Sequence, residues 1–428
     1  MSNFLVSQVR KLLAGRTVWA LGDQGIVSLG NFAVNIILAR NVSPTDFGIY
    51  ALVFSFFLLL NGLHGSFIDY PMTIRLAREK HDVARQTGLA LMVGAIAVVP
   101  LTLAVAVLFI VIDRPEIIPW AIFAFVAWRL QDVVRRSLMG QLRHAEAVPG
   151  DAISYLGQGI AMLALLYLDI LTLEAVFFVM GMTSSLALIV QALQVKPQLS
   201  GLSGAMVFVK DGWELGRWVV MRRVVATIEA QGIGWVLAGV HGLEATAGFR
   251  AAVNLLAVTH PISQGIGNLV LPSVAHAHRR SINEVVRVSW LLGLQGGVLV
   301  FPYFFLLLFV PSFALELIYG ADSPYIMMSD VVVIIVISYM MTYVSRIMAG
   351  TLAGLAKPKL TFQAALYGSI AAIFVSLPMA ALGGVYYAAI GKIVSNSVRL
   401  ISSTLFVRRE VAREANGLAL QGSVGDAR

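Results

Sequence analysis

Twelve long apolar segments constrain this chain more than any other feature. Each holds about 20 mostly uncharged residues, the length that an α-helix needs to cross the hydrocarbon core of a bilayer. They lie at residues 17–40, 47–69, 86–112, 117–139, 150–169, 173–195, 215–240, 247–271, 285–311, 328–350, 360–382 and 385–407. Only 13% of the residues are charged, about half the usual share of a soluble domain. The sequence therefore predicts an all-α integral membrane protein with about 12 transmembrane helices.

Several kinds of site are excluded or unsupported by residue content. The chain has no cysteine, which rules out disulfides and thiolate metal sites. His276 and His278 lie in a basic loop without a carboxylate partner, so we expect no metal there. No HExxH, Walker or GxSxG motif occurs. We expect no enzyme activity and no cofactor, and we assign the net charge of +8 to loop orientation and contact with membrane lipids, not to nucleic acid.

The basic residues divide the connecting loops into two sets. One set holds nearly all of the loop cations: Arg75, Arg78, Lys80, Arg85, Arg135, Arg136, Arg143, Lys196, Lys210, Arg279, Arg280, Arg287, Lys357 and Lys359. The opposite set holds only Arg40, Arg114 and Arg250, all close to helix ends. Because cytoplasmic loops carry the excess of Lys and Arg, the first set and both termini are predicted to be cytoplasmic.

The two halves of the chain resemble each other at an offset of about 200 residues. Asp46-Phe47-Gly48-Ile49-Tyr50 aligns with Thr246-Ala247-Gly248-Phe249-Arg250, and Pro100 falls near Pro302. Further on, Arg136-Ser137-Leu138-Met139-Gly140 aligns with Arg346-Ile347-Met348-Ala349-Gly350 at an offset of 210. We therefore predict two parallel six-helix repeats, residues 1–200 and 201–409, with a polar cytoplasmic tail at 410–428. Such transporters bind their substrate between the repeats.

Polar residues form stripes on four of the predicted helices. The first helix carries Gln24, Ser28, Asn31 and Asn35 on one face, beside Asp23. Matching polar residues on the second, seventh and eighth helices are Asn61, His64, Arg222, Arg223, Gln231, Arg250, Asn254 and Gln264. Polar groups inside a membrane commonly face a cavity, which predicts that these stripes line a central cleft. The alternative is that they form hydrogen bonds between helices.

Charges near the predicted cleft are mostly cationic, which suits a phosphate-bearing ligand because guanidinium binds phosphate oxygens in pairs. We name Arg223, Arg250, Arg222 and Arg40 as substrate-cavity candidates, although Arg222 and Arg223 can instead anchor a helix end at the headgroups. Asp23 is the candidate for coupling transport to an ion gradient. We also predict that Asp23 pairs with Arg222 or Arg223 and closes one state.

The stretch Leu38-Ala39-Arg40-Asn41-Val42-Ser43-Pro44-Thr45-Asp46-Phe47-Gly48-Ile49-Tyr50 resembles the passage after the first helix of Wzx-like polysaccharide flippases, which export O-antigen and exopolysaccharide units. This family belongs to the MOP superfamily together with the MATE drug exporters. A second-half echo, Gly242 to Ala252, is also similar, and the resemblance covers nearly the whole chain.

The resemblance implies a V-shaped pair of lobes with a cationic cavity that alternates between inward- and outward-open forms. The implied substrate is an undecaprenyl-pyrophosphate-linked oligosaccharide in the cytoplasmic (inner) membrane of a bacterium. Coupling to Na⁺, H⁺ or the membrane potential, and docking of a polysaccharide polymerase or co-polymerase, are open possibilities. Two alternatives compete: a MATE-type multidrug exporter, whose site should be acidic, and a membrane polymerase or ligase, which needs a large external loop that this chain lacks.

Overall fold

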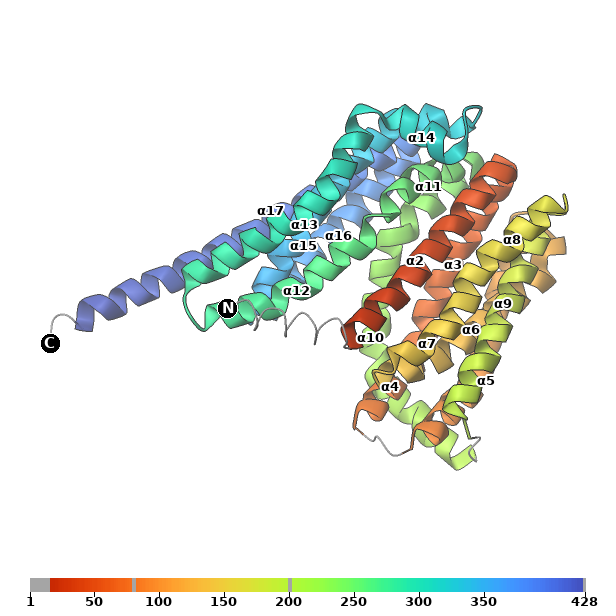
Figure 1. The fold of residues 1–428 in the computed structure, drawn as a ribbon, viewed down its shortest axis with the longest axis horizontal. Coiled ribbons are helices and arrows are strands. Elements are labelled where there is room, and N and C mark those ends of the chain that lie inside the picture. Colours follow the sequence, from red (N-terminus) through yellow and green to blue (C-terminus); the bar gives the residue numbers. More distant parts are fainter. Residues whose placement is uncertain (1–15, 79–81, 199–201, 426–428) are drawn as a thin grey trace. The chain divides into compact units, whose positions relative to one another are not determined.

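The computed structural model describes residues 16–78, 82–198 and 202–425, and within those ranges the chain is helical, with no β-strand (Figure 1). Seven described helical stretches are long and apolar enough to cross a membrane: Pro44–Phe67, Val83–Val111, Pro115–Gly140, Leu173–Val195, Ile282–Phe309, Pro324–Gly354 and Pro358–Asn416. The last has 59 residues, enough for two crossings at 1.5 Å per residue. The predicted multi-pass helical membrane fold is confirmed.

The chain packs into two compact units, residues 1–231 and 232–428. The first unit contains α2 (Arg16–Asn41), α3 (Pro44–Phe67), α4 (Asp69–Arg78), α5 (Val83–Val111), η1 (Pro115–Ile117), α6 (Ile118–Gly140), α7 (His144–Asp151), η2 (Ala152–Leu156), α8 (Gly157–Tyr167), α9 (Leu173–Val195) and most of α10 (Leu202–Val240). The second contains α11 (Leu243–Ala257), α12 (His260–His278), α13 (Ile282–Phe309), α14 (Pro311–Tyr319), η3 (Pro324–Met328), α15 (Ser329–Gly354), α16 (Pro358–Ala371), η4 (Ala372–Ser376) and α17 (Leu377–Gly425). The division falls within α10.

Backbone geometry repeats between the units. Leu142 and Ala356 both have a positive φ, 61° and 57°, and each lies two residues after the glycine that ends α6 or α15. Helices α5 and α13 begin 199 residues apart, whereas α6 and α15 begin 211 residues apart. The larger offset arises because the second unit inserts the short helix α14 before α15. The rising offset in the sequence therefore has a specific structural cause.

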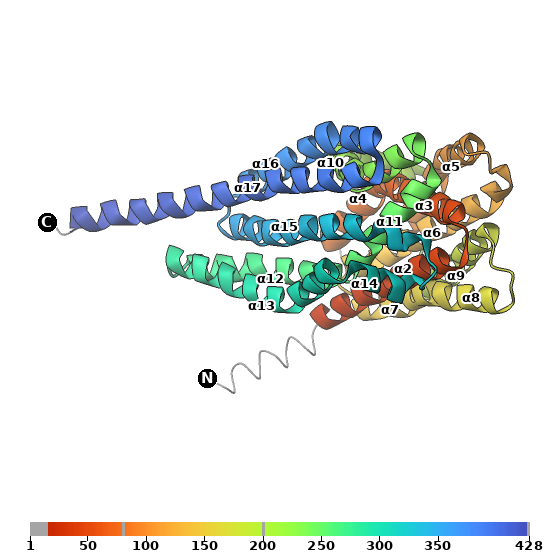
Figure 2. The same cartoon turned by 90° about the horizontal axis from the view of Figure 1, so that it is seen from above.

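Three predicted boundaries differ from the structure. The segment predicted as one helix at 247–271 is two helices, α11 and α12, which are separated at Val258 and Thr259. The segment predicted at 150–169 begins earlier, at His144, and contains a π-helical turn at η2. The segment predicted as a polar tail at 410–428 continues α17 as a helix to Gly425, which extends past its neighbours (Figure 2).

A tight turn at Gly383 and Gly384 divides α17 into two helices. Both residues have non-helical backbone angles. Gly384 has a φ of 64°, a backbone conformation that residues other than glycine rarely adopt. This is the turn expected between the last two predicted spans.

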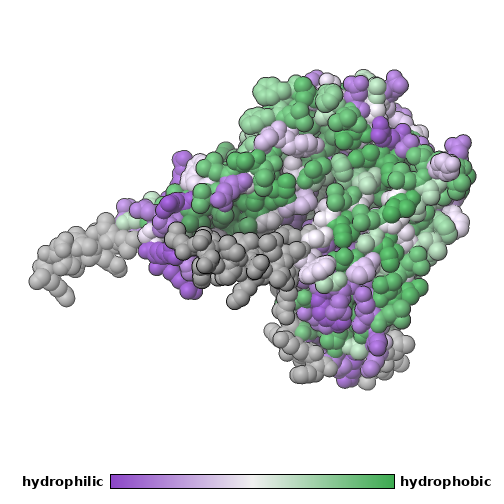
Figure 3. Space-filling model, in the orientation of Figure 1, coloured by the Kyte–Doolittle hydropathy of each residue, from purple (hydrophilic) through white to green (hydrophobic). Residues whose placement is uncertain are grey.

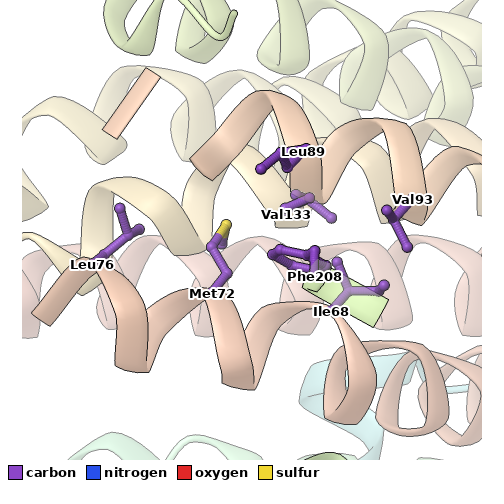
Figure 4. Close-up of a cluster of buried hydrophobic side chains, with 8 residues drawn as sticks. Ile68, Met72, Leu76, Leu89, Val93, Val133 and Phe208 are labelled. Carbon is purple, nitrogen blue, oxygen red and sulfur yellow. The ribbon is translucent and has the colours of Figure 1, made fainter. Parts of the chain in front are cut away.

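Apolar side chains pack inside each unit and also cover its outside. In the first unit, Phe208 of α10 is fully buried among residues of α4, α5 and α6, including Met72, Leu89 and Val133 (Figure 4). Hydrophobic residues also occupy much of the surface seen in Figure 3. Tyr167 and Phe309 are 90% and 80% exposed. Exposed apolar side chains on this scale indicate a surface that faces lipid.

Candidate functional site

Helix α6 carries a row of charged residues through the interior of the first unit. Arg129, Asp132, Arg135 and Arg136 are spaced three and four residues apart, so they lie on one side of the helix. The first three are buried, although they belong to an apolar stretch that is long enough to cross a membrane. Buried charges are stable only when they are paired and hydrogen-bonded, so their partners determine the site.

Arg129 is fully buried and contacts four side chains from three helices. Its Nη2 donates to both carboxylate oxygens of Asp69, at 3.2 and 3.1 Å, and to Nδ1 of His64 at 2.9 Å. Its Nη1 donates to Asp132 at 2.9 Å and to the amide oxygen of Asn61. Because Nδ1 of His64 accepts from a guanidinium, Nε2 carries the proton and donates to the Gly94 carbonyl oxygen at 3.0 Å. The guanidinium thus joins α3, α4 and α6.

Arg135 joins α2 and α7 to the same helix. Its Nε donates to Asp151 at 2.5 Å and its Nη2 donates to Asp23 at 2.9 Å, with Asp132 3.6 Å from Nη1. Around this centre, the amide groups of Gln131 and Gln191 both donate to Oδ1 of Asp151, at 3.3 and 3.1 Å. We refer to Asp23, Asp69, Asp132, Asp151, Arg129, Arg135 and Arg136 together as the first-unit ion network.

The predicted pairing of Asp23 with Arg222 or Arg223 is not the one in this structure. Asp23 pairs with Arg135, which had been predicted to lie in a cytoplasmic loop and is instead buried inside α6. Arg223 is half-buried near Asp69: a Cβ atom on Gly65 would lie 2.5 Å from Oδ2 of Asp69 and 2.9 Å from Nη1 of Arg223. Gly65 therefore leaves space for both side chains, and Arg222 is exposed.

The polar stripe of α2 is bonded mainly to its own helix. Asn31 donates to the Val27 carbonyl oxygen at 2.9 Å, and Asn35 donates to the Asn31 carbonyl oxygen at 2.7 Å. Gln24 is exposed and reaches Ser28. Arg40 is also exposed, whereas Asp23 is buried. Of the residues predicted in the first unit, the structure brings Asp23, Asn61 and His64 into or against the ion network, with Arg223 beside it.

The second unit has the opposite charge distribution inside its helices. Its described acidic residues lie in first helical turns, in α14 or the turn after it, or in the C-terminal part of α17: Glu244, Glu284, Glu316, Asp322, Asp330, Glu410 and Glu414. Three of its cations, Arg346, Lys392 and Arg250, are half-buried, and each is near enough for its charge to act on His260. We call His260, Arg346, Lys392 and Arg250 the second-unit cationic cluster.

Arg346 is the best-defined member of this cluster. Its aliphatic carbons lie against α12, where a Cβ on Gly267 would be only 3.0 Å from its Cδ. Its Nη1 is buried and has no hydrogen-bond partner among the described residues. His260 stacks on Tyr339 with ring centroids 5.6 Å apart, and both residues line a cavity of about 30 Å³ together with Arg346. A cavity of that size holds about one water molecule.

Other predicted residues of the second half occupy different places. Asn254 is buried, and its amide donates to the Tyr319 hydroxyl at 3.4 Å, which links α11 to α14. Gln264 on α12 is exposed, and Gln231 is half-buried at the end of the first unit. For all of the predicted substrate-cavity residues, contact with substrate stays a prediction, as does the cleft between the repeats.

Arg129, Gln131 and Asp132 were not predicted from the sequence as site residues. These residues lie in a span whose mean hydropathy is dominated by aromatic and aliphatic neighbours. The signal that would have revealed them is their spacing, which places Asp132 on one helix face within reach of Arg129 before it and of Arg135 and Arg136 after it. Arg346 had been noticed only as the repeat counterpart of Arg136.

Comparisons with known proteins support the architecture. No family model matches the sequence, and no curated protein matches it significantly. Among solved structures, an inward-facing multidrug resistance MATE family transporter of the MOP superfamily has a TM-score of 0.67 at 15% identity, covering 91% of this chain and 95% of that chain. An outward-facing form has a TM-score of 0.61 at 15% identity, with 95% and 98% covered.

A third solved structure is a MOP superfamily transporter from Pyrococcus furiosus, described by a reverse polarity of its binding pocket that suggests a different function. It has a TM-score of 0.61 at 13% identity and covers 94% of this chain and 97% of that chain. The chain therefore has the fold of MATE-type MOP superfamily transporters.

Proposed function

We propose that this chain is a flippase that moves a lipid-linked, pyrophosphate-bearing oligosaccharide across the bacterial cytoplasmic membrane by alternating access. The fold is shared with solved inward-facing and outward-facing transporters, which supports alternating access. The cargo is argued from the charges of this chain and from its resemblance to Wzx-like flippases.

The observation that carries the cargo assignment is the buried Nη1 of Arg346, which lacks a hydrogen-bond partner within the described residues. A buried donor nitrogen without an acceptor is costly, so a ligand oxygen that accepts a hydrogen bond from Nη1 would be favoured. The neighbouring charges of Arg250 and Lys392 act on the same ring, His260, which makes the region cationic. A pyrophosphate provides several acceptor oxygens and the matching charge.

The cavity beside Arg346 is too small for a pyrophosphate in this conformation. His260 is exposed, so the head group would reach the cluster at this residue and displace the stacked pair of His260 and Tyr339 as it binds. Such a local change would accompany a transport cycle, in which the binding site changes shape between its two forms.

One observation favours a second function, an ion-coupled multidrug exporter. Four buried aspartates lie in the first unit: Asp23, Asp69, Asp132 and Asp151. Carboxylates inside a membrane commonly bind cations or protons. However, each of them forms an ion pair with an arginine of α6, so the region is largely neutralised. Pocket polarity has been linked to function in this fold, because the Pyrococcus furiosus transporter is described in those terms.

The proposal is tested by reconstituting the protein in liposomes with a fluorescent undecaprenyl-pyrophosphate oligosaccharide. Wild-type protein should translocate the glycolipid. Arg346→Gln should reduce the translocation rate at least ten-fold, and Arg346→Lys should retain part of the wild-type rate. Arg143→Gln, which changes a partly exposed arginine paired with Glu146, serves as the matched control and should transport normally. Equal transport by Arg346→Gln, or efflux of a cationic dye without movement of the glycolipid, would contradict the proposal.

A further inference from the structure

An apolar groove on the second unit lies next to the cationic cluster. The groove has a volume of about 660 Å³ and runs between α13, α15 and α17, three helices that pack together in Figures 1 and 2. Most of its lining is aliphatic or aromatic, including Val285, Trp290, Leu294, Phe301 and Ile347, with a few small polar residues and Arg408 among them. The volume is within the range of about 300–1,000 Å³ that is typical of ligand sites.

Tyr343 separates the groove from the cavity at Arg346. It lines both spaces, together with Phe301 on the groove side and Phe304 on the cavity side. Its hydroxyl donates to the Gly293 carbonyl oxygen at 2.7 Å, and its ring packs edge-on against Phe301 at 5.6 Å. The close approach depends on Gly296, where a Cβ would lie 2.4 Å from the Tyr343 hydroxyl. The apolar groove and the cavity at Arg346 therefore meet at the side chain of Tyr343.

The length of the groove indicates what kind of apolar chain fits it. Along α13 the lining extends from Val285 to Phe301, a distance of about 24 Å at the helical rise of 1.5 Å per residue. One leaflet of the hydrocarbon core is only about 15 Å thick. The groove is thus longer than the leaflet that ordinary acyl chains fill, which favours a longer chain such as a polyprenyl tail.

We infer that the groove between α13, α15 and α17 binds the polyprenyl tail of a lipid pyrophosphate while its head group contacts Arg346 on the other side of Tyr343. This inference rests on the proposed function for its head group and adds a separate tail site.

Gly293 allows the groove to be filled without disturbing the fold. A Cβ at this position would meet only Ile347, at 3.8 Å and beyond, so Gly293→Leu places its side chain in open space within the groove. Replacing a helical glycine also removes a helix-disfavouring residue. The control on the same helix is Val298→Leu, which adds one carbon at a residue that is 71% exposed and outside the groove lining.

The experiment measures binding of undecaprenyl pyrophosphate and, separately, of inorganic pyrophosphate to purified protein in detergent. Gly293→Leu should weaken undecaprenyl pyrophosphate binding at least ten-fold and leave pyrophosphate binding unchanged, while Val298→Leu should match wild type for both. If Gly293→Leu binds the lipid as tightly as wild type does, and also binds pyrophosphate in the separate measurement, the tail site is wrong while the proposed function stands. Failure of wild type to bind pyrophosphate would contradict the proposed function instead. Displacement of the lipid by phosphatidylglycerol at equal concentration would reassign the groove to membrane phospholipid.

Discussion

The two units share a backbone plan but use interior charge in opposite ways. In the first unit, arginines of α6 are matched by buried aspartates from α2, α4, α6 and α7. In the second unit, the helix equivalent to α6 is α15, and its Arg346 has a buried Nη1 without a hydrogen-bond partner among the described residues. The first arrangement joins helices of one unit to one another, whereas the second leaves positive charge available to an anion. The two units therefore keep one fold although their interior charges differ, and the proposed function assigns substrate binding to the second unit.

The largest expected effect is on the stability of the first unit. Arg129→Met removes the guanidinium that pairs with both Asp69 and Asp132 and leaves these two buried carboxylates with fewer partners. Loss of one member of a buried ion pair typically costs about 3–5 kcal/mol. We expect Arg129→Met to lower the free energy of unfolding by about that amount, measured by thermal or denaturant unfolding in detergent. A change below about 1 kcal/mol would mean that the network does not stabilise the unit.

A charge introduced into the second unit should make it resemble the first. Thr342 lines the cavity with Arg346 and lies one helical turn before it, so a carboxylate at Thr342 can pair with that guanidinium. Thr342→Glu should reduce glycolipid transport about ten-fold, whereas Thr342→Gln should preserve most of it. Transport at the wild-type rate by Thr342→Glu would show that free positive charge at Arg346 is not required.

The two arginines that the sequence singled out as strongest candidates should differ in effect. Arg250 belongs to the second-unit cationic cluster, whereas Arg223 lies beside Asp69 of the first unit. We expect Arg250→Ala to reduce transport several-fold more than Arg223→Ala in the same liposome assay. Equal losses would indicate that the two arginines contact substrate alike and that the contrast between the units is weaker than the structure suggests.

The smallest effect is expected at the surface pair of Arg143 and Glu146. Arg143 donates from Nε to Glu146 at 2.7 Å, and this bond lowers the pKa of the Glu146 carboxyl. Both side chains are substantially exposed, so their attraction is screened by water. Arg143→Met should change the free energy of unfolding by less than about 1 kcal/mol. A loss as large as that of Arg129→Met would remove the distinction between buried and exposed pairs.

Much of the fold was predictable because membrane helices are long and apolar. The segment predicted at 173–195 has the same bounds as α9, and the turn at Gly383 and Gly384 was expected. The break at Val258 and Thr259 was not predicted, because mean hydropathy over a whole segment does not record the local backbone. Pro261, in the first turn of α12, is the local signal of a helix start at this point.

The candidate site was less predictable, since burial and pairing depend on which helices pack together. Asp23 was recognised as an interior charge, yet its partner Arg135 had been assigned to a loop by the excess of basic residues there. Arg129 and Asp132 were hidden within an apolar span. Pairing across helices needs tertiary contacts, such as that of α2 with α7, which the order of residues alone does not give.

The most direct test of the account is a crosslinking map of the bound head group. Undecaprenyl pyrophosphate that carries a photoreactive group next to its phosphates would be irradiated on the full-length protein in lipid nanodiscs and the labelled peptides identified by mass spectrometry. We expect labels on α12 and α15 near His260 and Arg346, which disappear with excess pyrophosphate and in Arg346→Gln. Labels confined to α6 around Arg129 and Arg135 would contradict it, because the charges of the first unit would then bind the ligand.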